Sequence, residues 1–211
     1  MQLPILSILI FLPIVGIGIL LILNRKHHKG LKYATLAISL AEFLFSLPLW
    51  FNFDSQTAAM QFVERREWLP TYGISYYLGI DGFSLLLIML TTFLTPLCVL
   101  ATWDDIQHRV KEFMVCLLAL MSGMIGVFVS LDLFLFYVFW EVMLIPMYLL
   151  IGVWGNPARR VYAAIKFFLF TMFGSLLMLV AILVLYFHYG KTTGTYTFDL
   201  LKLYSVSIPF N

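Results

Sequence analysis

The chain alternates between long apolar runs and short polar connections. Six runs, near 3–23, 31–51, 80–101, 113–130, 131–154 and 160–188, approach or exceed the roughly 20 residues with which a helix crosses a bilayer. No internal repeat or low-complexity stretch interrupts this pattern. The sequence therefore predicts an all-α polytopic membrane protein with six transmembrane helices.

The connections add local detail to this prediction. The longest one, 52–79, contains MQFVERREWLPTYG, which is compatible with a short interfacial helix or hairpin. A solvated loop anchored by Trp68 and Tyr72 is the preferred interpretation. Asp81 then precedes the third run, where an acid favours a helix N-terminus. Small residues in the fourth run predict close helix packing; they are Ala119, Ser122, Gly123 and Gly126.

Composition places the chain in a lipid bilayer and argues against nucleic acid as a partner. It is 62% hydrophobic and 11% charged, with a mean hydropathy of +0.97, whereas soluble domains have roughly 45–50% and 25%. The net charge of +2 is small and dispersed. Cys98 and Cys116 both lie inside apolar runs, so neither a disulfide nor a metal site is predicted.

Positively charged residues predict the orientation of the helices. Eight lie in or beside the first, third and fifth connections: Arg25, Lys26, Lys29, Lys32, Arg109, Lys111, Arg159 and Arg160. Four lie on the other side: Arg65, Arg66, Lys191 and Lys202. Because Lys and Arg are enriched in cytoplasmic loops, the N-terminus is predicted outside. The charges around Lys111, in the third connection, are interpreted as a solvated cluster.

Glu141 is the main candidate for a functional site. It lies near the middle of LDLFLFYVFWEVMLIPMYLLIGVW, residues 131–154, where an acid such as Asp costs about 2.5–3.5 kcal/mol on insertion scales. Five residues later, Pro146 cannot donate a backbone hydrogen bond to the Val142 carbonyl. Proton handling is the preferred interpretation, and a permanently protonated acid bonded to a neighbouring backbone is the alternative.

Two other charged residues lie within apolar runs. Lys166 lies roughly 9 Å along the sixth helix from Arg160. Its side chain either reaches the interface or turns inward and modulates a neighbouring acid. Glu42 shares a helix face with Ser39 and Ser46. Packing or assembly is the first interpretation of Glu42, and proton handling is the second.

The sequence contains no glycine-rich phosphate loop, no paired-cysteine motif and no nucleophile beside a base. We therefore expect the chain to move an ion rather than transform a substrate, and we predict no redox site on it.

Several segments resemble one known family. DLFLFYVFWEVMLIPMYLLIGVWG followed by RRVYAAIKFFLFTMFGSLLMLVAILVLYF resembles the M-type (chain 4) antiporter-like subunit of proton-pumping NADH:quinone oxidoreductase, respiratory complex I. LGIDGFSLLLIMLTTFLTPL and VKEFMVCLLALMSGMIGVFVSLDLF are similar to the same family. The similarity covers residues 70 to 190.

The resemblance implies a fourteen-helix fold with two inverted five-helix repeats, of which this chain is the N-terminal part. Residues 1–112 would form a three-helix region, 113–190 would begin the first proton-channel repeat, and 191–211 would be a tail before the seventh helix. Because that helix should begin near Asn211, we expect a fragment, a truncated gene product or one piece of a split subunit.

The family also implies a role and a setting for the chain. Glu141 would belong to a redox-driven proton path and act with a lysine on a discontinuous seventh helix. NADH, flavin, iron–sulfur clusters and quinone are expected on other subunits, with membrane-arm subunits as partners. The expected location is the bacterial inner membrane.

Two other readings stay open. One is the related D-type subunit of a multisubunit sodium/proton antiporter or of a membrane-bound hydrogenase. The other is a structural module of six helices, in which Glu141 could become Gln without loss of proton translocation.

Overall fold

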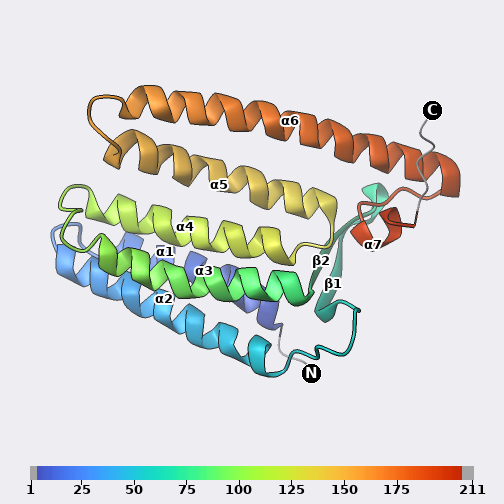
Figure 1. Cartoon of the computed structure of the whole chain (residues 1–211), viewed down its shortest axis with the longest axis horizontal. Helices are drawn as coiled ribbons and strands as arrows, with labels where there is room; N and C mark the ends of the chain where they lie inside the picture. The colour runs from blue at the N-terminus through green and yellow to red at the C-terminus, as the bar shows by residue number, and fades with distance from the viewer. Residues whose placement is uncertain (1–3, 206–211) are drawn as a thin grey trace.

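The computed structural model describes residues 4–205, and most of them are helical (Figure 1). The elements are α1 (Ile5–Ile22), α2 (His28–Phe51), β1 (Gln61–Leu69), the 3-10 turn η1 (Pro70–Tyr72), β2 (Ile74–Ile80), α3 (Gly82–Ala101), α4 (Val110–Val129), α5 (Leu133–Trp154), α6 (Arg160–Thr193) and α7 (Leu200–Leu203). Among the described residues, α1 to α6 are long and apolar enough to cross a membrane. The six predicted spans are confirmed, and the protein is a multi-pass membrane protein. Residues 206–211 of the predicted tail lie outside the described part.

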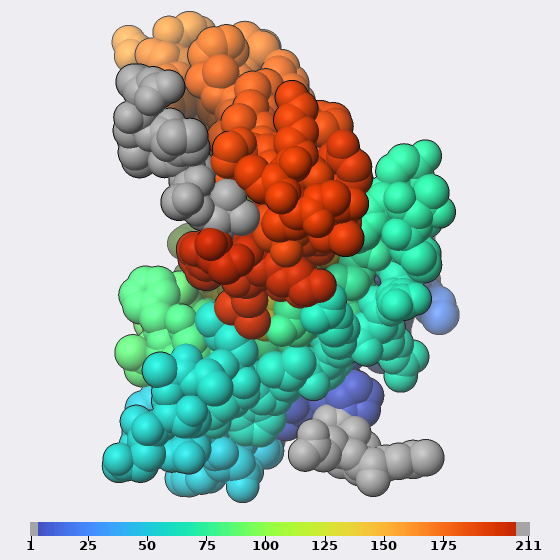
Figure 2. Space-filling model, turned by 90° about the vertical axis from the view of Figure 1, so that its right-hand side faces the viewer, coloured from blue at the N-terminus to red at the C-terminus, as the bar shows by residue number. Residues whose placement is uncertain are grey.

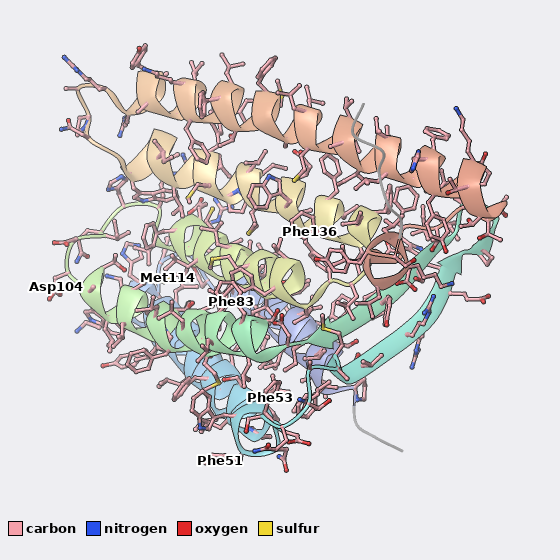
Figure 3. All side chains as sticks on the ribbon, turned by 45° about the vertical axis from the view of Figure 1, so that its right-hand side comes forward. Phe51, Phe53, Phe83, Asp104, Met114 and Phe136 are labelled. Atoms are coloured by element: carbon pink, nitrogen blue, oxygen red, sulfur yellow. The ribbon has the colours of Figure 1, made fainter. Side chains whose placement is uncertain are left out.

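The helices run back and forth between two different ends (Figure 1). The connections 23–27, 102–109 and 155–159 meet at what we call the basic end. The β-hairpin and α7 lie at the opposite, hairpin end. In Figure 3, Asp104 marks the basic end, whereas Phe51 and Phe53 lie toward the hairpin end. Four of the five connections between the spans are short and place consecutive helices antiparallel, and the long connection between α2 and α3 returns the chain from the hairpin end.

Helix α4 lies at the centre of the bundle and is the most buried of the six spans. Its glycines allow close approach, because an added Cβ at Gly126 would lie 2.4 Å from the Phe139 ring, and one at Gly123 would lie 2.5 Å from Met143. On the α1 side, the Ser122 hydroxyl donates to the Ile10 carbonyl at 2.7 Å. The predicted role of these small residues in packing is confirmed.

The long connection folds into a hairpin, so the preferred interpretation of 52–79 as a solvated loop is wrong. β1 and β2 pair antiparallel, with Arg65 opposite Tyr77 and Arg66 opposite Tyr76. Gly73 closes the turn at φ +68, and an added Cβ would lie 2.1 Å from the Tyr196 carbonyl oxygen. β2 is mostly buried while β1 is mostly exposed. A two-stranded hairpin is only marginally stable by itself. Packing of the buried strand β2 against the helix ends therefore stabilises this one.

Backbone hydrogen bonds join the hairpin to the start of α5 and to the segment before α7. The Leu131 N–H donates to the Tyr77 carbonyl at 2.8 Å, and the Leu133 N–H donates to the Phe198 carbonyl at 2.9 Å. Arg65 forms an ion pair with Asp199 at 3.1 Å. Figure 2 shows this end of the molecule, where the hairpin and α7 cover the helix ends. The long loop is thus part of a platform that fixes where α5 begins.

Two side chains from other elements form hydrogen bonds with free backbone groups at the two ends of α1. At its start, the Glu64 carboxylate of β1 accepts from the Leu6 N–H at 2.8 Å, the position where a negative charge is favourable. At its end, Lys111 donates to the carbonyls of Leu21 and Leu23 at 2.6 and 2.9 Å. The interpretation of Lys111 as part of a solvated cluster is therefore wrong, because free helix carbonyls attract a cation.

Candidate functional site

Glu141 lies inside the bilayer-spanning part of α5. It is eight residues from Leu133 and thirteen from Trp154, or about 12 Å and 20 Å along the helix. The side chain is partly buried, and its Oε1 atom is inaccessible and has no hydrogen-bond partner among the described residues. Such an atom in a native structure calls for an additional partner, which a bound proton or a water can supply.

Tyr137 and Ser175 are the polar neighbours of this site. Tyr137 lies one helical turn before Glu141 and has both the Glu141 carboxyl and the Ser175 hydroxyl of α6 as side-chain neighbours. The Ser175 hydroxyl itself donates to the Met172 carbonyl at 3.0 Å. Neither residue was predicted from the sequence as a neighbour of Glu141. The spacing of four residues places Tyr137 on the same helix face as Glu141, but only the packing of α6 on α5 identifies Ser175.

Pro146 is buried within α5, and the helix continues through it without interruption. Its missing N–H still leaves the Val142 carbonyl without its usual helical donor. The proposed support of a helix break by Pro146 stays a prediction.

Lys166 lies on another face of α6, away from the acid. It is exposed, and its Nζ lies 5.8 Å from the centre of the Tyr162 ring. Ser175, beside the Glu141 site, is nine residues further along α6, which amounts to about 13 Å of rise and half a turn of rotation. The structure therefore does not bring Lys166 and Glu141 together.

Glu42 is more completely buried than Glu141. Its exposed fraction is 0%, and neither carboxyl oxygen has a hydrogen-bond partner within residues 4–205. It lies on α2, which packs against α3, α1 and α4. The two acids thus belong to different parts of the bundle.

Asp132, just before α5, is a buried acid that was not predicted from the sequence. Its carboxylate accepts from the N–H groups of Phe134 and Leu135, and from Ser75 of β2 at 2.9 Å. Burial raises the pKa of Asp132 above its ordinary value, while these hydrogen bonds act in the opposite direction. Asp132 therefore positions the first turn of the helix that carries Glu141.

Comparison with family models accounts for nearly the whole chain. Residues 6–127 match the model described as NADH-ubiquinone oxidoreductase chain 4, amino terminus. Residues 130–209, which include Glu141 and Lys166, match the model described as NADH:quinone oxidoreductase/Mrp antiporter, TM.

Individual relatives agree with these models. NADH-ubiquinone oxidoreductase chain 4 of Arabidopsis thaliana is 49% identical over 187 residues, covering 89% of this chain and 38% of the relative. NADH-quinone oxidoreductase subunit M of Rhodobacter capsulatus is 45% identical over 208 residues, covering 97% of this chain and 39% of the relative. The chain therefore spans about two fifths of the length of these relatives.

A solved structure shows the same fold. Respiratory complex I from Thermus thermophilus with bound NADH contains a chain that matches with a TM-score of 0.79 and 26% identity. The match covers 97% of this chain and 40% of that one. On the strength of the model that spans residues 6–127, this chain belongs to the NADH-ubiquinone oxidoreductase chain 4 family.

Proposed function

We propose that the chain works in the membrane arm of NADH:quinone oxidoreductase and that Glu141 carries protons on a redox-driven translocation path. The observation that carries this proposal is a mid-membrane carboxyl with an inaccessible, unpartnered oxygen. An ionisable residue at this depth is costly and commonly serves ion or proton movement.

The surroundings of Glu141 suit proton exchange. The neighbouring Tyr137 and Ser175 carry hydroxyls, which can both donate and accept hydrogen bonds. A proton leaving Glu141 would thus meet a hydroxyl at its first step.

Other parts of the proposal lie outside this chain. NADH, flavin, iron–sulfur clusters and quinone would be bound by other subunits, and a lysine on a further helix would complete the path. Lys166 would act on Glu141 only electrostatically, because the two residues lie on different faces and at different depths. The predicted membrane is the bacterial inner membrane, with the basic end on its inner side.

Substitution of Glu141 by Gln in the assembled complex tests the proposal. Gln keeps the shape and polarity but cannot release a proton. We expect the rate of NADH-driven proton pumping to fall by at least about tenfold, because a positioned proton-transferring group typically contributes about 10²–10⁴-fold to a rate. Pumping is measured by acidification of sealed vesicles.

Glu112→Gln is the matched control, because this acid lies at the basic end, where it pairs with Arg25 at 3.7 Å. The control should pump normally. Full pumping by an assembled Glu141→Gln complex would show that Glu141 is structural, as in the six-helix module.

A sodium/proton antiporter subunit is the second candidate, because the model matched by residues 130–209 also names the Mrp antiporter. Vesicles prepared without sodium separate the two functions. NADH-driven acidification there supports the oxidoreductase, whereas proton movement that needs a sodium gradient and no NADH supports the antiporter.

A further inference from the structure

Helix α2 buries a row of polar side chains while many of its apolar side chains are exposed. Lys32, Thr35, Ser39, Glu42 and Ser46 recur every three or four residues and are at most 3% exposed. This spacing places them on one face. Apolar side chains cover the opposite side and are exposed; they include Leu40, Leu44 and Phe45. We call the buried row the polar seam of α2.

Helix α3 adds hydroxyls to this seam. Thr91, Thr92 and Thr95 are buried, and the hydroxyls of Ser46 and Thr92 lie 3.0 Å apart. Each hydroxyl also bonds to a backbone carbonyl of its own helix, as Thr35 does to Leu31 at 2.9 Å. The seam is therefore satisfied locally except at Glu42.

Glu42 is the exception, since both carboxyl oxygens are buried without a partner. Neither ion pair found within residues 4–205 involves Glu42. On its own helix, Lys32 is ten residues away, about 15 Å, and donates to the Trp103 carbonyl.

The neighbouring helices supply no counter-charge either. α1 contains no titratable side chain, and α3 contains only the exposed Cys98. On α4, Lys111 is held by the carbonyls of Leu21 and Leu23, and Glu112 pairs with Arg25. Cys116 of α4 is a buried thiol and carries no charge that could balance a carboxylate.

We propose that Glu42 is a proton-binding site in the α1–α3 region, separate from Glu141. An unpaired charge at this position would be too costly, so the carboxyl is neutral at rest. A neutral carboxyl still has one donor and free acceptor positions. In this proposal a water links the carboxyl to the seam hydroxyls, which are polar groups on the same helix face.

The polar seam of α2 also indicates from which end of the bundle protons reach Glu42. From Glu42, Ser39 and Thr35 lead toward Lys32 at the basic end, at intervals of three or four residues. Toward the hairpin end, Ser46 is followed on the buried face by Leu49, which is fully buried. Protons therefore reach Glu42 from the basic end, with Ser39 as the first relay.

Infrared spectroscopy of the assembled complex tests both parts of the proposal. At pH 7, the spectrum of the wild type minus that of Glu42→Gln should contain the carbonyl stretch of a protonated carboxyl. This band should shift when H2O is replaced by D2O under native conditions. Ser39→Ala should keep the band and slow its shift by at least about fivefold, the effect of one lost hydrogen bond.

Two results would overturn the proposal. Absence of the carbonyl band would mean that Glu42 is ionised, and a band that does not respond to D2O would mean a static acid. Glu42→Asp serves as a second variant, since its carboxyl should give a band at a changed frequency. In a Glu141→Gln background the Glu42 band should persist, so this outcome is independent of the role of Glu141.

Discussion

At the scale of residues, the acids of this chain differ because their surroundings differ. Asp81 accepts from the Ser84 N–H at 2.7 Å, and this hydrogen bond lowers the pKa of Asp81 below its ordinary value. The pKa of Asp132 is raised by burial. By linkage, ionised Asp81 stabilises the fold at neutral pH, and this contribution is lost as pH falls through its folded pKa. For Asp132 the sign is opposite, because its folded state prefers the proton.

The cap formed by Asp81 leads to a local prediction. Asp81→Ala should cost about 1 kcal/mol and speed amide exchange in the first turn of α3 about fivefold, because the Ser84 N–H loses its acceptor. Asp81→Asn should restore most of the protection against amide exchange at pH 7. Because Asn does not titrate, this protection should not be lost at acidic pH. Hydrogen exchange with mass spectrometry measures this turn. Equal exchange in all three proteins would mean that the cap contributes nothing.

At the scale of elements, the contact between α4 and α5 sets the position of Glu141. Gly126 and Gly123 of α4 lie against Phe139 and Met143 of α5, which flank Glu141 two residues away on either side. At its start, α5 is fixed by Asp132 and by the hairpin. The acid is therefore held by two neighbouring elements rather than by its own helix alone.

Gly126→Ala tests this contact. Ala normally favours a helix over Gly, but here the added methyl group would overlap the Phe139 ring, a packing strain of about 1–3 kcal/mol. We expect less assembled complex and slower proton pumping.

Gly18→Ala is the matched control, because no atom lies within 4 Å of its added Cβ. A second change, Phe139→Leu, should relieve part of the defect. If Gly126→Ala assembles and pumps like the control, the close packing of α4 and α5 is not what positions Glu141.

At the scale of the whole molecule, the two ends of the bundle differ in structure and in charge. Most Lys and Arg residues gather at the basic end, whereas the hairpin, α7 and the buried acids Asp132 and Asp199 lie at the other. The distribution predicts that the basic end faces the cytoplasmic or equivalent compartment.

Cysteine labelling tests this orientation. In a chain with Cys98 and Cys116 replaced by Ala, Ser55→Cys at the hairpin end should react with an impermeant maleimide from outside sealed vesicles of native orientation. Ala158→Cys, exposed at the basic end, should react only after the membrane is opened. The reverse labelling pattern would overturn the predicted topology.

The candidate site was only partly predictable from the sequence. Glu141 stood out because a lone acid in a long apolar run is recognisable without coordinates. Ser175 did not, because it approaches Tyr137 from a helix more than thirty positions later. Glu42 was noticed with its serines, yet packing was preferred over proton handling, since the burial of both oxygens depends on α1, α3 and α4 as well as α2.

The sequence by itself determined the six spans, the charge asymmetry of their connections and the cap at Asp81. These features follow from local composition and from hydrogen bonds within a few residues. Only the tertiary structure decided that 61–80 is a hairpin, that Lys111 closes the end of α1, and that Lys166 lies away from Glu141. Each of these features depends on contacts between residues that are far apart in the sequence. Such contacts leave no periodic pattern of hydrophobic and polar residues from which they could be predicted.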